Sequence, residues 1–174
     1  MSYSLHDANL LGCRARPHRW YFCLDAGMRD LTSAEVDELL RSERVAHVAV
    51  VDGDDPYVGP LSFVYVDGVI AFRTVEGRRL AALRTNPRVA IEVTRTGPGV
   101  ADWATALLAG TATILDHGSE AAGYVSQILA KYRAAYGVMG DMPEWLLDPD
   151  ASLVRVELDD VSGRASTVER PGRL

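Results

Sequence analysis

The sequence contains few cysteines, almost no lysine and no long hydrophobic run. Two cysteines, Cys13 and Cys23, are too few for a disulfide scaffold and are typical of a chain whose thiols stay reduced. Lys131 is the single lysine among 18 basic residues. No apolar stretch approaches the roughly 20 residues that cross a bilayer. The first residues lack the charge-then-apolar order of a secretory signal. We therefore expect a cytoplasmic protein that does not bind membranes.

Basic residues are also fewer than acidic ones. The 174 residues carry 24 acidic and 18 basic side chains, which gives a net charge of -6. An acidic balance disfavours generic nucleic-acid binding, because phosphate backbones attract basic surfaces. A local basic cluster can still bind a small anion against the overall sign of charge. Hydrophobic residues make up 48% of the chain, which suits one ordinary globular domain.

The pattern of apolar residues predicts about six strands and two or three helices. Thr32 and Glu35 form the pattern of a capping box, which begins a helix ending near Glu43. Asp67-Gly68 between two β-branched runs predicts a tight hairpin. Further helices are expected over 76–85 and from Ser119 onward, where Tyr124, Ile128, Tyr132 and Tyr136 would pack on the sheet. Strands are expected at 45–51, 57–66, 69–74, 88–94, 103–115 and 152–158, with a turn at 53–56 and a bend at Gly110.

Strands joined mostly by hairpins favour an antiparallel barrel with outer helices over a parallel doubly wound sheet. We expect the barrel domain to span residues 31–164. Residues 1–30 would form an N-terminal arm or leader, and residues 165–174 a C-terminal tail. His47 alternates with apolar neighbours in its strand, which predicts a hydrogen-bonded inward side chain rather than a catalyst. His6, Cys13, His18 and Cys23 lack the close spacing of a metal site.

The segment with the clearest chemical content runs from a strand end at Phe72 to a helix start at Gly77. Unpaired amides at a helix start carry partial positive charge and suit an anion. Thr74 adds a hydroxyl, and Arg78 and Arg79 add two guanidinium groups that match a phosphate. Arginines on a solvated surface are common, however. On spacing alone, phosphate binding and a solvated surface both stay open.

The run PLSFVYVDGVIAFRT (60–74), followed by GRRLAALRTNPRVAIEV (77–93), resembles the pyridoxamine 5'-phosphate oxidase-like family of flavin-binding split barrels. It is most similar to the branch with the nitroimidazole-resistance-type proteins. The resemblance covers roughly residues 31–115, and VRVELDDVSGR (154–164) also resembles that branch. It implies a mainly β, six-stranded antiparallel split barrel with flanking helices, which forms a homodimer and holds FMN at the subunit interface.

The resemblance also implies roles for particular residues. The strand beside the flavin ring would be Pro60, Leu61, Ser62 and Phe63. The strand end that leads to the phosphate would be Phe72, Arg73 and Thr74. The helix start that grips the phosphate would be Gly77, Arg78 and Arg79. Trp103 would approach the flavin or the dimer contact, or else pack as a core or interface aromatic.

The sequence departs from the oxidase proper at the phosphate. There the family has a small hydroxyl residue and an Arg-Lys pair, whereas this chain has Gly77 and Arg78-Arg79, so Thr74 is the candidate replacement for the hydroxyl. Deazaflavin is therefore an alternative to FMN. The pyridoxal-phosphate-binding segment has no clear match, so vitamin B6 oxidation is not expected. The expected function is an FMN-dependent oxidoreductase acting on a small molecule. The alternatives are a non-catalytic flavin, deazaflavin or haem binder and a cofactor-free barrel acting through its dimer surface.

Overall fold

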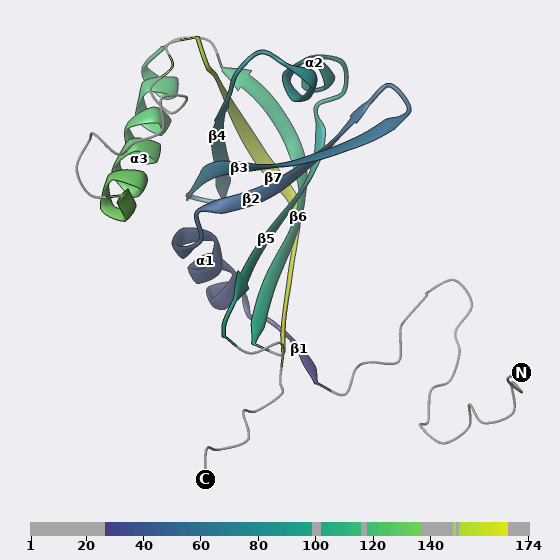
Figure 1. Ribbon diagram of the computed structural model, residues 1–174, viewed down its shortest axis with the longest axis vertical. Coiled ribbons are helices and arrows are strands. Elements are labelled where there is room, and N and C mark those ends of the chain that lie inside the picture. Colours follow the sequence, from purple (N-terminus) through teal and green to yellow (C-terminus); the bar gives the residue numbers. More distant parts are fainter. Residues whose placement is uncertain (1–26, 99–101, 116–117, 137–147, 149, 167–174) are drawn as a thin grey trace, which may run out of the picture.

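The computed structural model describes residues 27–98, 102–115, 118–136, 148 and 150–166, and within them the chain forms one antiparallel barrel (Figure 1). The strands are β1 (Met28–Asp30), β2 (Val45–Asp52), β3 (Asp55–Val66), β4 (Val69–Thr74), β5 (Arg88–Thr96), β6 (Trp103–Leu115) and β7 (Ser152–Ser166). The helices are α1 (Ser33–Ser42), α2 (Arg78–Thr85) and α3 (Ser119–Tyr136).

The sheet runs in the order β1-β7-β4-β3-β2-β5-β6, and pairing of β6 with β7 closes it. Strands β2 to β7 form the expected six-stranded barrel, so the predicted fold class is confirmed. Strand β1 is an addition, because it pairs with the far end of β7. It lies within residues 1–30, the segment expected to be an arm or leader. None of the described helices has the length and apolar character needed to cross a membrane.

Strand β7 is much longer than the sequence pattern predicts, because it continues to Ser166 rather than ending near Leu158. A bulge lies between the two halves: Ala109 pairs with Asp160 and Gly110 with Leu158, so Asp159 is the extra residue on β7. The expected bend at Gly110 therefore coincides with the bulge, but the inserted residue is on the partner strand. A side chain at Gly110 would overlap the backbone carbonyl of Glu157, so the two strands need a glycine there.

Two apolar clusters hold the barrel and its helices together. The barrel interior is built around the fully buried Phe63 and Phe72, and α1 and α2 pack against it. On the opposite face of β3 and β4, α3 packs Ile128 and Tyr132 onto the sheet. This confirms the expected packing face of that helix, except at Tyr136, whose side chain lies outside the described residues. The Tyr132 hydroxyl accepts a hydrogen bond from the backbone N–H of Phe63 at 3.2 Å and donates to the carbonyl of Arg44.

Local signals near helix starts and hairpins set most of the boundaries. Thr32 accepts a bond from the Glu35 amide and returns its own amide to the Glu35 carboxylate, so the capping box is confirmed. Helix α2 begins at Arg78, two residues after the expected start. The first hairpin is tighter than predicted, because Gly53 takes a left-handed φ of 64° and β3 begins at Asp55.

The prediction that His47 points inward is wrong. Its side chain is 51% exposed, and Nδ1 lies 3.1 Å from Oε2 of Glu92 on β5. Alternation in a strand shows which residues share a face but does not show which face is the core. In β2 the inward set is Ala46, Val48 and Val50, which leaves His47 on the outer surface of the sheet.

Candidate functional site

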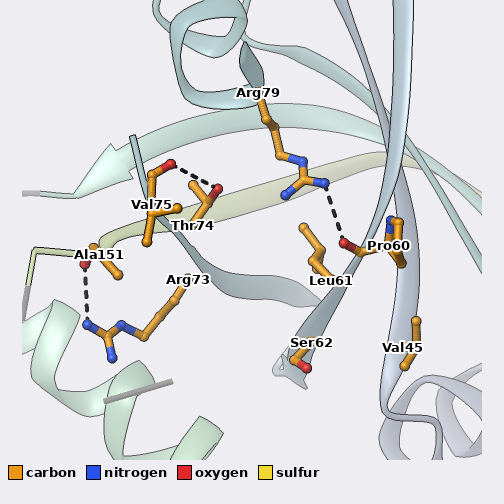
Figure 2. A pocket seen from close by; sticks show the side chains of 9 residues that line it. All are labelled: Val45, Pro60, Leu61, Ser62, Arg73, Thr74, Val75, Arg79 and Ala151. Carbon is orange, nitrogen blue, oxygen red and sulfur yellow. Dashed lines mark hydrogen bonds between the residues drawn. The ribbon is translucent and has the colours of Figure 1, made fainter. Parts of the chain in front are cut away.

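A cavity of about 310 Å³ lies where β3, the end of β4 and the first turn of α2 meet (Figure 2). Its volume is at the lower end of the range for small-molecule sites. Its lining residues are Val45, Pro60, Leu61, Ser62, Arg73, Thr74, Val75, Arg79 and Ala151. Six of these nine were predicted from the sequence as cofactor-binding residues. The fold therefore brings together the strand segment at residues 60–62, the strand end at residues 73–74 and one arginine of the helix start.

Arg79 is one of two half-buried arginines that line this cavity, the other being Arg73. One of the terminal nitrogens of Arg79 donates to the Pro60 carbonyl at 3.4 Å, which is a long hydrogen bond. Its Nε is buried and has no hydrogen-bond partner among the described residues. Burial lowers the pKa of Arg79, and the nearby Tyr57 partly offsets that effect. Because a guanidinium stays protonated in proteins, the cavity holds a positive charge with donor capacity to spare.

A glycine in β3 allows Arg79 to take this position. A Cβ built at Gly59 would lie 2.8 Å from the Arg79 Nη2, closer than side-chain carbons approach their neighbours. The guanidinium therefore lies against bare backbone. Sequence reasoning did not single out Gly59, although a glycine inside a strand is itself a sign that another group approaches closely.

Arg73 and Thr74 enter the cavity from the end of β4. Arg73 donates to the carbonyls of Asp148 and Ala151, the latter at 3.4 Å, and so ties β4 to the segment before β7. The Thr74 hydroxyl has a long 3.4 Å contact with the carbonyl of Val75. A ligand oxygen could replace this weak contact at little cost. Sequence reasoning missed Val45, Val75 and Ala151, whose apolar side chains carry no chemical signal.

Arg78 does not line the cavity, although its guanidinium and that of Arg79 both lie beside the Tyr57 ring. Its Nε lies 2.7 Å from Oδ2 of Asp52, its Nη2 lies 3.7 Å from Asp55, and its guanidinium lies over the Tyr57 ring. These carboxylates come from the β2–β3 hairpin. Successive residues of a helix point about 100° apart, so two adjacent arginines at a helix start need not reach one ligand.

The remaining predicted site residues do not line the cavity. Phe63 and Phe72 are fully buried in the barrel interior. Gly77 caps α2 through its carbonyl, which accepts from the Ala81 amide at 3.0 Å. Trp103 is half-buried at the start of β6, opposite Thr96. Any contact of these residues with a cofactor stays a prediction.

In the described part of the chain, no three His, Cys, Asp or Glu side chains gather as the ligands of a metal would. The set weighed from the sequence, His6, Cys13, His18 and Cys23, lies outside the described residues.

An antiparallel six-stranded barrel with outer helices, and with a basic cavity at the first turn of α2, defines the split-barrel class of fold. Residues 32–165 match the family model described as pyridoxamine 5'-phosphate oxidase. The chain therefore belongs to that family. No curated protein matches the chain.

Solved structures show the same fold. A FAD-binding protein from Mesorhizobium loti is 24% identical, with a TM-score of 0.64 over 79% of this chain and 96% of its own. A candidate 5-nitroimidazole antibiotic resistance protein from Bacteroides thetaiotaomicron is 16% identical, with a TM-score of 0.61, and the match covers 79% of this chain and 88% of that protein. The haem storage protein HutZ from Vibrio cholerae is 16% identical, with a TM-score of 0.59, and the match covers 74% of this chain and 92% of that protein. At these identities the likeness establishes the fold alone.

Proposed function

We propose that this protein binds FMN in the cavity between β3 and α2 and acts as a flavin-dependent oxidoreductase. The observation that carries the proposal is the half-buried Arg79, whose Nε has no hydrogen-bond partner among the described residues. A phosphate there would accept charge-assisted hydrogen bonds from Arg79, and the Thr74 hydroxyl can add one more. The family membership and the FAD-binding relative support a flavin as the occupant.

The flavin ring would extend from the phosphate along the β3 segment at residues 60–62. This part of the cavity presents Pro60, Leu61 and Ser62, with Val45 beside them. Apolar side chains and strand backbone suit a flat aromatic ring, since they exclude water and offer hydrogen-bonding groups at its edge. Arg78 is paired with Asp52 and would not bind the phosphate directly.

A second copy of the chain would complete the site. The outer face of β2 and β3 carries exposed apolar side chains, Val45, Val51 and Val58, the last 63% exposed. Val45 also lines the cavity. Water-exposed apolar patches of this kind commonly mark protein contacts, and homodimers with two-fold symmetry are the commonest solution. We therefore propose a homodimer that covers the open side of the cavity.

Bound FMN would supply the hydride or electron transfer. The chain's own residues would anchor the phosphate through Arg79 and keep water from the ring with Val45 and Leu61. Among the described residues, the cavity lining includes no His, Cys, Asp or Glu. The lack of such side chains supports the second candidate, a protein that binds flavin or deazaflavin without turnover. It also means that no described lining residue could serve as a haem ligand.

The proposal is tested by the absorption spectrum of the purified protein and by mass identification of the molecule released on denaturation. We expect flavin bands and FMN. Reduction of the bound flavin by a nicotinamide, followed by reoxidation with turnover, would support the enzyme. Bound flavin that is inert to reductants would support the binding protein, and a colourless protein that does not quench FMN fluorescence would contradict both.

A further inference from the structure

A second cavity, of about 300 Å³, lies between α1 and α3 on the outside of β3. Its lining residues are Arg41, Val64, Tyr65, Val66, Gln127 and Lys131. None of them lines the cavity described above. Both helices lie on the same side of the barrel (Figure 1). The site is thus formed by the packing of two outer helices on one strand, and the proposed flavin site does not use it.

Lys131 is the most unusual group in this cavity. Its Nζ is buried and has no hydrogen-bond partner within the part of the chain that the structure describes. The ammonium lies 4.2 Å from the centre of the Phe63 ring, a cation–π contact that only partly replaces water. A buried ammonium without an acceptor is costly, so the position favours either the neutral amine or an added anion.

The electrostatic environment of Lys131 agrees with this description. Burial lowers the pKa of Lys131 to about 8, with a smaller lowering from Arg44 and an opposing contribution from Glu43. Glu43 itself is paired with Arg95, whose Nε lies 2.8 Å from its carboxylate. Among the residues that the structure describes, no carboxylate satisfies the amine directly, and a bound anion would stabilise its protonated form.

The other polar groups of the cavity favour an anion as well. Arg41 brings a second cation from α1, and its guanidinium lies 5.5 Å from the centre of the Tyr65 ring. Gln127 adds an amide that can donate. The Tyr65 hydroxyl is already committed to Oδ1 of Asp37 at 2.8 Å, so the Asp37 charge is partly satisfied. Val64 and Val66 provide an apolar surface on β3.

We propose that this cavity is a second ligand site, which binds a small organic carboxylate between Arg41 and Lys131. The carboxylate accepts hydrogen bonds from Arg41 and from Lys131, whose Nζ turns from the Phe63 ring toward the cavity, and a short apolar body rests on Val64 and Val66. Binding takes up a proton when Lys131 is neutral. Affinity is therefore complete at pH values below about 8 and falls as the pH rises above that value.

The single lysine makes the test direct, because protein labelled with ¹³Cε-lysine gives one lysine signal. We expect butanoate at millimolar concentration to shift this signal saturably and to raise its titration midpoint. The neutral butanamide should have no such effect. Inorganic phosphate should bind more weakly, because it lacks an apolar body.

Three variants locate the response. Arg41 is exposed in the structure, so the Arg41→Gln variant should fold normally. Its affinity for butanoate should fall about tenfold, as expected for the loss of one charge-assisted hydrogen bond. Arg133→Gln on the exposed side of α3 is the charge-matched control and should bind like the parent. Arg79→Gln should also bind like the parent, which separates this site from the proposed flavin site.

The proposal would be overturned by no saturable shift with butanoate, by an equal response to butanamide, by tighter binding of phosphate than of butanoate, or by an unchanged affinity in Arg41→Gln. Loss of the response in Arg79→Gln would assign it to the other cavity and would also overturn the proposal.

Discussion

Replacing Gly59 with alanine should weaken FMN binding while leaving the fold intact. The new Cβ would lie 2.8 Å from Nη2 of Arg79, and the neighbour that must move is the end of a flexible side chain. The backbone at Gly59 is outside the left-handed region, so alanine introduces no strain there. In a strand, alanine should stabilise the protein by about 0.5 kcal/mol relative to glycine.

The displaced guanidinium is the source of the binding loss. Moving it by several tenths of an ångström weakens its bonds to a phosphate, and losing one charge-assisted hydrogen bond costs about 1.5 kcal/mol, or roughly tenfold in affinity. Riboflavin has no phosphate and should bind the variant and the parent alike. Fluorescence quenching titrations with both ligands measure the two affinities, and urea denaturation measures the stability.

Gly123→Ala is the matched control. Nothing lies within 4 Å of a Cβ at Gly123, which is in α3, so the change should stabilise the helix by about 1 kcal/mol and leave FMN affinity unchanged. The reasoning would be refuted if Gly59→Ala bound FMN as tightly as the parent, or if it weakened riboflavin equally.

Three further predictions concern stability and assembly. Tyr132→Phe leaves the buried Phe63 amide without its hydroxyl acceptor and should lower the free energy of unfolding by about 1–3 kcal/mol in urea denaturation; an unchanged midpoint would contradict this packing. The pKa of Glu35 is held at about 2 by its bond to Arg29 and by the Thr32 cap, so its stabilisation is present above the ordinary value of 4.5 and is lost as the pH falls toward 2. Glu35→Gln should remove that part of the acid dependence in pH-dependent thermal unfolding, and an unaltered acid limb would count against it. Val58→Glu should convert the proposed dimer to a monomer in sedimentation velocity and lower the affinity for FMN. If the variant dimerises as strongly as the parent, the interface lies elsewhere.

Local signals account for the parts of the fold that the sequence predicted well. Asp67 and Gly68 both adopt positive φ, as their hairpin requires, and the start of β4 at Val69 follows directly from that turn. The capping box at Thr32 likewise needs only neighbours in the chain. The length of β7 could not be predicted in this way, because the strand continues past Asp159 through its pairing with the distant strands β6 and β1.

The candidate site was predictable as a set of segments but not as a geometry. Arg78 and Arg79 look equivalent in the sequence, and their separation depends on Asp52, which the fold brings beside one of them. The outward position of His47 depends on which face of β2 meets the barrel interior. Gly59 carried a usable signal, since an interior strand glycine indicates a close approach, but its partner Arg79 is 20 positions away in the chain.

The central claim is that Arg79 holds the phosphate of a flavin, and the ratio of FMN to riboflavin affinity measures it most directly. The account predicts that Arg79→Gln lowers this ratio by roughly 10- to 100-fold, as expected for the loss of charge-assisted bonds to a phosphate. Arg78→Gln should lower it far less, because that arginine is paired with Asp52. An unchanged ratio in Arg79→Gln, or equal losses of both ligands, would contradict the account.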